Sequence, residues 1–101
     1  MRAALANGVP REAWEAMEYI RQWGKAPPGY VGGRTFANDG RNGGQALPRT
    51  DAYGREITYR EYDIAPHTPG MNRGQQRIVL GRDGSANYTR NHYVSFAPFG
   101  S

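Results

Sequence analysis

Four side chains carry the groups that metal-free cleavage of RNA requires: Glu61, Arg73, Arg77 and His92. Such cleavage needs a base that takes the 2′-hydroxyl proton and an acid that protonates the departing 5′-oxygen. It also needs fixed positive charge where negative charge builds on the phosphate. A carboxylate, an imidazole and two guanidinium groups supply these functions. A structural ion pair between Glu61 and an arginine is the alternative interpretation, because such pairs are common across adjacent strands.

Strand alternation predicts that these groups meet on one face of a sheet. Glu61 alternates with Tyr62 in a predicted strand at 57–63, and Arg77 alternates with Ile78 in another at 76–81. Successive side chains point to opposite faces of a strand. If the apolar residues face a helix, Glu61 and Arg77 share the opposite, solvated face.

One segment has helical periodicity, and we expect it to cover this sheet. It follows Pro10, which suits a helix start, and it ends at Gly24 and the Pro27-Pro28-Gly29 segment. Its apolar residues recur every three or four positions, which is typical of a buried stripe: Ala13, Ala16, Met17, Ile20 and Trp23.

The rest of the chain has the short β-branched and aromatic runs of strands. We predict strands at 34–37, 57–63, 76–81, 86–89 and 93–97, with His92 at the start of the last. The Asp83-Gly84 pair favours a hairpin between the third and fourth strands. The fold class is therefore α+β: one main N-terminal helix packed on a twisted antiparallel sheet of about four to five strands.

Size and charge narrow the possible functions. The chain has 101 residues and a formal charge of +4, and Lys25 is the one lysine among thirteen basic residues. This length suits a single domain, 1–101, and arginine favours phosphate partners. The absence of cysteine excludes disulfides and Cys-ligated metals. No apolar run is long enough for a membrane span or a signal peptide.

Several segments resemble the bacterial guanyl-specific ribonucleases, the family of barnase. These are Phe36-Ala37-Asn38, Leu47-Pro48, Tyr59-Arg60-Glu61-Tyr62-Asp63-Ile64, Thr68-Pro69-Gly70, Arg73, Arg77-Ile78-Val79, Tyr88-Thr89, His92-Tyr93 and Phe96. They occur in the family's order and at nearly its spacings, between about Pro10 and Phe99. The family's fold, a helix on a twisted antiparallel sheet, agrees with the periodicity.

The resemblance implies a role for each matching residue. Glu61 is then the general base, His92 the general acid, and Arg73 and Arg77 bind the scissile phosphate. The substrate-binding residues would be Phe36, Asn38, Asp39, Tyr59 and Tyr93. Core packing remains an alternative for Phe36 and Tyr93, and His67 is expected to be a surface residue. No metal and no cofactor is implied.

The predicted base-binding loop departs from the family. A short Asn-Arg-Glu segment is usual there, and its glutamate binds guanine. This chain has a longer loop from Asn38 to Gln45 without a glutamate, and Asp39 is its one acid. Asp39 is either the guanine acceptor or a turn residue, and Arg41 either contacts phosphate or is solvated. This departure bears on the expected cleavage after guanosine and not on the expected cleavage of RNA.

The resemblance also implies a biological setting. The expected protein is a secreted monomer, either a free enzyme or the C-terminal toxin domain of a larger protein, and it is matched by an acidic inhibitor or immunity protein. Two other functions fit the charge: a non-catalytic basic RNA-binding module, and a protein-interaction or inhibitor domain. Glu61 separates the first of these from an enzyme, because a carboxylate repels phosphate in a binding surface.

Overall fold

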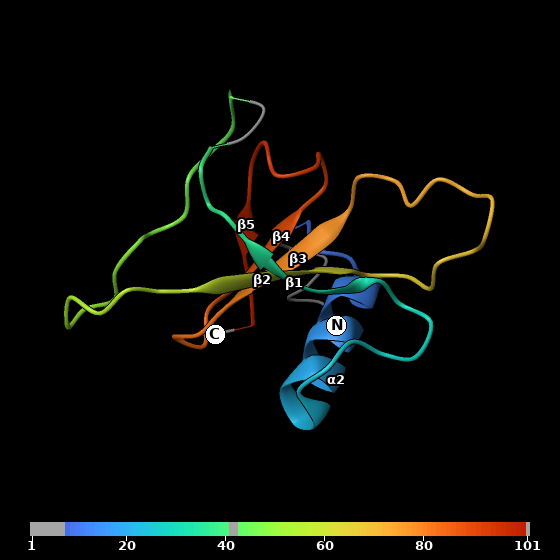
Figure 1. Ribbon diagram of the computed structural model, residues 1–101, viewed down its shortest axis with the longest axis horizontal. Coiled ribbons are helices and arrows are strands. Elements are labelled where there is room, and N and C mark those ends of the chain that lie inside the picture. The colour runs from blue at the N-terminus through green and yellow to red at the C-terminus, as the bar shows by residue number, and fades with distance from the viewer. Residues whose placement is uncertain (1–7, 41–42, 101) are drawn as a thin grey trace.

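A computed structural model describes residues 8–40 and 43–100 of the chain. It contains one helix, α2 (Arg11–Trp23), packed on one face of an antiparallel sheet. Figure 1 shows the sheet above α2, with the long connections before β2 and before β3 extending to opposite sides. The predicted α+β class is confirmed. The predicted loop after Phe36 is also present, although Arg41 lies outside the described residues.

Helix α2 begins after Pro10 and ends where Gly24 adopts a left-handed conformation, with φ of 74°. The Gly24 amide donates to the carbonyl of Ile20 at 2.7 Å, which satisfies an otherwise unpaired helix-end acceptor. The predicted stripe is confirmed at its first four positions, Ala13, Ala16, Met17 and Ile20, which are buried.

Trp23 does not belong to this stripe, and its predicted place in the core is wrong. It is 59 % exposed and contacts the ring of Tyr19, one turn earlier on α2. Trp14, which the predicted stripe omitted, packs its indole against Phe99 instead, with 5.2 Å between ring centroids. The C-terminal segment therefore packs on α2 through Trp14 and not through Trp23.

The five strands lie side by side in chain order. They are β1 (Gly32–Phe36), β2 (Tyr59–Asp63), β3 (Arg77–Gly81), β4 (Ala86–Thr89) and β5 (Ala97–Pro98). All neighbours are antiparallel, and a turn containing Asp83 and Gly84 joins β3 to β4, as the sequence predicts. The register places Asp63 opposite Arg77 and Glu61 opposite Val79.

Each face of the sheet has its own apolar cluster. The face toward α2 buries Tyr62 and Ile78 with Met17, while the second face, opposite α2, buries Val79 and Tyr93. The expected alternation is thus confirmed, because Glu61 and Arg77 lie on the second face. The expectation that this face is solvated is wrong. Loop residues cover much of it, and Glu61 and Arg77 are only 9 % and 4 % exposed.

The segment expected to form a strand at 93–97 is mostly a turn, and β5 is limited to Ala97–Pro98. The turn is held by Asn91, whose Oδ1 accepts from the hydroxyl of Thr89 at 2.9 Å and from the amide of Ser95 at 3.0 Å. These side-chain bonds replace the ladder of a strand, and the strand prediction there is wrong.

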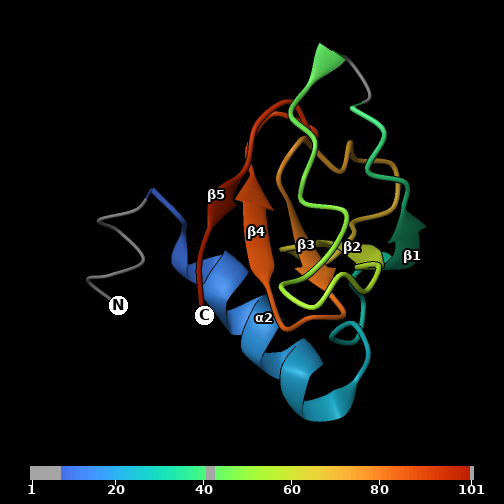
Figure 2. The same ribbon diagram turned by 90° about the vertical axis from the view of Figure 1, so that its left-hand side faces the viewer.

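Figure 2 shows α2 below the sheet, with β4 and β5 leading up into this turn. No helix in the described part of the chain has the length and apolar content that crossing a bilayer requires.

Candidate active site

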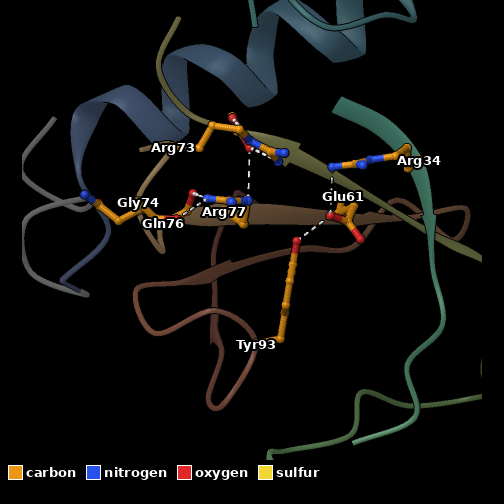
Figure 3. Close-up of polar contacts among 8 residues, drawn as sticks. Arg34, Glu61, Arg73, Gly74, Gln76, Arg77 and Tyr93 are labelled. Carbon is orange, nitrogen blue, oxygen red and sulfur yellow. Dashed lines mark hydrogen bonds and ion pairs between the residues drawn. The ribbon is translucent and has the colours of Figure 1, made fainter. Parts of the chain in front are cut away.

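Glu61 occupies the middle of β2, on the second face of the sheet. Its Oε1 accepts a hydrogen bond of 2.6 Å from the hydroxyl of Tyr93 and lies 4.0 Å from Nη2 of Arg34 (Figure 3). Both contacts use Oε1, and among the described residues Oε2 makes neither a hydrogen bond nor an ion pair. A fixed carboxylate with one oxygen still available can accept a proton from a bound ligand.

Arg34 was not among the residues selected from the sequence. A β-bulge between Gly32 and Arg34 shifts the register of β1, and Gly33 adopts a φ of 94° there. Arg34 thereby becomes the cross-strand partner of Glu61, while its side chain stays 61 % exposed. A bulge re-aims a side chain in a way that simple alternation does not predict.

Asp63 holds the two predicted phosphate-binding arginines. Its oxygens accept two hydrogen bonds of 2.9 Å from Nε and Nη2 of Arg73. Nε of Arg77 lies 3.0 Å from Oδ1 of Asp63, as an ion pair without hydrogen-bond geometry in the described structure. The hydrogen bonds with Asp63 raise the pKa of Arg73 above its usual value, so this guanidinium keeps its charge.

Arg77 is fixed further by the backbone before β3. Its Nη1 donates to the carbonyls of Gly74 and Gln76, at 3.2 and 2.8 Å. Its side chain is 5 % exposed, whereas that of Arg73 is 27 % exposed. Figure 3 shows Arg73 and Arg77 together on one side of Glu61 and Arg34 on the other, so charges from β1, β2, β3 and the loop before β3 meet in a small region. Three guanidinium groups face two carboxylates, which leaves the region net positive.

His92 and Tyr93 follow Thr89 in the turn after β4. Both have left-handed backbones, with φ of 54° and 76°, and their rings lie 4.8 Å apart. The amide of His92 donates to the carbonyl of Gln75, and that of Tyr93 to Oγ1 of Thr89, both at 3.0 Å. Two successive strained residues cost roughly 1 to 3 kcal/mol each, and such strain is concentrated at functional sites.

The arginines and His92 line one pocket of ≈ 430 Å³, which we call the arginine–histidine pocket. Its polar lining comprises His67, Asn72, Arg73, Gln75, Arg77 and His92. The structure therefore brings together three of the four residues selected for catalysis, with Glu61 beside them. His67 is exposed, as expected, but sequence alone did not place it at this pocket.

The predicted base-binding residues lie around the loop that follows β1. Asn38 has a φ of 55°, its Nδ2 donates to the carbonyl of Leu47 at 2.9 Å, and its Oδ1 accepts from the Leu47 amide at 2.7 Å. Asn38 thus closes the loop, while Asp39 is exposed beside it. The side-chain amide of Asn38 is therefore used within the loop.

The three aromatic residues predicted to bind substrate are largely internal. Phe36 packs against Tyr93, with 4.9 Å between ring centroids, and is 3 % exposed. Tyr59 is 2 % exposed and its hydroxyl donates to the carbonyl of Pro48 at 2.7 Å. Tyr93 is 1 % exposed, and its hydroxyl is the group that reaches Glu61. These contacts support the floor of the site, and whether any of the three touches substrate remains a prediction.

The site contains the groups for proton transfer and for anion binding. No group of three or more potential metal ligands among His, Asp and Glu occurs within residues 8–40 and 43–100.

A search of curated proteins finds no match to the chain. A family model described as ribonuclease matches residues 2–99. That match covers nearly the whole chain, and the chain therefore belongs to the ribonuclease family.

Proposed function

We propose that this ribonuclease is an endonuclease that cleaves single-stranded RNA after guanosine, by transesterification through a 2′,3′-cyclic phosphate and without a metal ion. One observation carries the proposal: a buried carboxylate, Glu61, lies close to Arg73 and Arg77 (Figure 3), which line a pocket together with the imidazole of His92. In a surface that only binds phosphate, that carboxylate would weaken binding, since it repels the ligand.

Glu61 is the base in this mechanism. Its Oε2 takes the proton of the 2′-hydroxyl, and the 2′-oxygen then attacks the adjacent phosphorus. The hydrogen bond from Tyr93 and the charge of Arg34 fix Oε1 and hold the carboxylate in place. Both contacts leave Oε2 directed to the ligand as the proton acceptor.

His92 is the acid, and it protonates the 5′-oxygen as the bond from phosphorus to that oxygen breaks. The products are a 2′,3′-cyclic phosphate and a free 5′-hydroxyl. The carbonyl of Gln75 fixes the backbone of His92, and the ring of Tyr93 lies against the imidazole. Placing base and acid on different elements, β2 and the turn after β4, suits attack and departure on opposite sides of the phosphate.

Arg73 and Arg77 stabilise the charge that accumulates on the phosphate oxygens. Asp63 positions both guanidinium groups before substrate arrives, so little reorganisation accompanies the reaction. Asp63 also offsets part of their charge. This balance favours the transition state, which is more negative than the bound substrate, over tight binding of the substrate itself.

Guanine preference rests on the loop closed by Asn38. In this loop Asp39, an exposed carboxylate, follows Asn38 directly. The Watson–Crick edge of guanine carries two adjacent N–H donors, which a carboxylate can accept, whereas that of adenine carries one. Asp39 takes the place of the glutamate usual in guanyl-specific ribonucleases.

We also propose that the protein acts outside the cell that makes it, either as a secreted enzyme or as a delivered toxin domain. An active ribonuclease endangers its producer. A cytoplasmic inhibitor with an acidic surface is the partner that a net charge of +4 and an arginine-lined pocket would attract.

The test is cleavage of a defined single-stranded RNA in excess EDTA, with the product ends identified by mass spectrometry. We expect full activity, fragments ending in guanosine 2′,3′-cyclic phosphate, and no cut after a 2′-deoxyguanosine placed in the same RNA. Loss of activity in EDTA or cleavage at the deoxy position would contradict the mechanism. Equal cutting after all four nucleotides would contradict only the guanine preference.

A further inference from the structure

A second pocket, of ≈ 420 Å³, lies on the face of the sheet that α2 covers. We call it the helix-side pocket. Its floor is apolar and comes from Ile20, Tyr62 and Leu80, and its basic residues are Arg21, Arg60 and Arg82. Arg60 and Glu61 are neighbours on β2 and therefore point to opposite faces. The helix-side pocket is thus separated from the proposed catalytic site by the sheet.

Two of the three guanidinium groups are held in place by main-chain carbonyls. Arg21, in the last turn of α2, donates to the carbonyls of Gly84 and Gly100, each at 2.7 Å. Arg60 donates to the carbonyl of Gly33 at 2.6 Å. Figure 2 shows the lower part of α2 close to the turn that joins β3 to β4, which brings Arg21 near Arg82. Pre-positioned donors lose little entropy when a ligand binds.

None of the ten described residues that line this pocket is acidic. Three carboxylates are next to lining residues in the sequence, and two of them, Glu61 and Asp63, lie on the other face of the sheet. The third, Asp83, follows Arg82 directly. Its Oδ1 accepts from the amide and the hydroxyl of Ser85, at 3.1 and 2.6 Å, so that oxygen is used within the turn. The positive charge of the pocket is therefore not cancelled by its own lining, and its electrostatic complement is an anion.

The size and chemistry of the pocket fit one type of ligand. A volume of ≈ 420 Å³ lies in the range of small-molecule sites, which combine an apolar surface with a few placed polar groups. Guanidinium groups pair with phosphate oxygens in a fork geometry, whereas an apolar surface with an aromatic ring can accept a base. We propose that the helix-side pocket binds a phosphorylated nucleotide unit, outside the site that cleaves RNA.

The test is titration of the ¹⁵N-labelled full chain with two probes, uridine monophosphate and a 2′-O-methyl uridine pentamer. Neither has a free 2′-hydroxyl next to a phosphodiester, so both survive an active enzyme. We expect shifts of the amide signals of Thr58, Gly81, Gly84 and Ser85, which line the pocket. Equal affinity for the two probes would identify a free nucleotide as the ligand of the pocket. Tighter binding of the pentamer would identify an RNA strand as the ligand.

Variants then test which charges carry the binding. Arg60→Gln with Arg82→Gln should raise the Kd at these amides tenfold or more. The control, Arg11→Gln with Arg55→Gln, removes the same charge from exposed residues outside the pocket and should change it less than twofold.

Three outcomes would overturn the proposal. They are the absence of shifts with either probe in the wild-type chain, an equal loss of affinity in both double variants, and shifts caused by a poly-glutamate peptide but by neither nucleotide probe. Cleavage of a dinucleoside monophosphate is measured in parallel. It reports on the proposed function alone, so a failure there is distinct from a failure of the helix-side pocket.

Discussion

Glu61 is the residue at which an enzyme and a binding module differ. In the proposed mechanism its Oε2 accepts a proton, and in a binding module it only adds negative charge beside phosphate. Glu61→Gln keeps the shape and can still accept from Tyr93. We expect the single-turnover cleavage rate to fall by roughly 10²-fold or more, while affinity for RNA stays equal or increases.

Glu56→Gln is the matched control for this prediction, since Glu56 is exposed and lies before β2, outside the site. It should leave the cleavage rate within about twofold, because a distant surface charge is screened by salt. Thermal unfolding of both variants checks that they are folded. An unchanged rate in folded Glu61→Gln would show that Glu61 is a structural partner of Arg34 and not the base.

His92 is tested by comparing its loss with the loss of His67 in the same pocket. We expect His92→Gln to lower kcat by about 10²- to 10⁴-fold, because the acid that protonates the departing oxygen is gone. His67→Gln should keep kcat within about twofold, although its KM for RNA can rise because His67 lines the same pocket. A large loss of kcat in His67→Gln, with kcat retained in His92→Gln, would exchange the two assignments.

At the level of residues, the alternation of side chains predicted positions correctly where the strands are regular. It placed Glu61 and Arg77 on one face because β2 and β3 have no bulge between these positions. It missed Arg34, since a bulge with a left-handed Gly33 sets that residue opposite Glu61. Asp63 was not among the residues selected for the site, although the register Asp63–Arg77 makes it the anchor of both arginines.

Asn38 stabilises the loop after β1, much as a capping residue stabilises the end of a helix. Two buried hydrogen bonds to Leu47 close the loop, and the backbone of Asn38 is left-handed. Asn38→Gly tolerates that φ but leaves the Leu47 amide and carbonyl unpaired, at about 2 kcal/mol of unfolding free energy. Asn38→Ala should lose roughly 1 kcal/mol more, because alanine is strained there.

The specificity of both Asn38 variants is measured as the ratio of kcat/KM for substrates that present guanosine and adenosine. We expect this ratio to fall in each variant, since an open loop no longer fixes the position of Asp39. Asn91→Ala is a useful comparison, because Asn91 closes the turn after β4 by similar bonds. A ratio that falls only in Asn91→Ala would place base recognition outside the loop after β1.

Strand tyrosines predict how the sheet responds to alkali. Burial raises the pKa of Tyr59, Tyr62 and Tyr88, and the charge of Asp83 adds to the effect at Tyr59. A pKa that is higher in the folded chain gives stability that is complete below the unfolded value of about 10. That stability is lost as pH rises through the folded value, so the unfolding free energy should decline above about pH 10.

Tyr59→Phe isolates one of these groups. At pH 7 it should lower the unfolding free energy by about 1 kcal/mol, because the hydroxyl that donates to Pro48 is gone. Its decline above pH 10 should be shallower than that of the wild type, measured by urea unfolding. Tyr53 is 83 % exposed, so Tyr53→Phe should follow the wild-type curve. Parallel curves for wild type and Tyr59→Phe would show that Tyr59 does not titrate with unfolding.

At the level of elements, the sequence predicted correctly those features that short-range interactions determine. Helix α2, its glycine cap and the turn at Asp83-Gly84 follow from short-range chemistry, and all three are confirmed. The segment at 93–97 reads as a strand from its aromatic residues, but the side chains of Thr89 and Asn91 impose a turn. Trp23 fits the helical period, yet Phe99 packs on Trp14 instead, which no local pattern reveals.

The whole molecule presents arginines on both faces of one sheet. The arginine–histidine pocket and the helix-side pocket are each cationic, and a net charge of +4 adds a field that attracts RNA from a distance. This field affects the encounter with substrate more than the chemical step, because buried groups such as Glu61 and Arg77 are little screened by salt.

Ionic strength should therefore separate encounter from chemistry. For a long single-stranded RNA, we expect log(kcat/KM) to fall linearly with log[salt], with a slope of about −0.7 for each phosphate that the protein neutralises. A dinucleoside monophosphate offers one phosphate and should have the shallower slope, and kcat for both should change little. The helix-side pocket adds a further expectation: Arg60→Gln with Arg82→Gln should flatten the slope for long RNA and leave that for the dinucleoside unchanged. Equal slopes for the two substrates would mean that only the phosphate being cleaved contacts this protein.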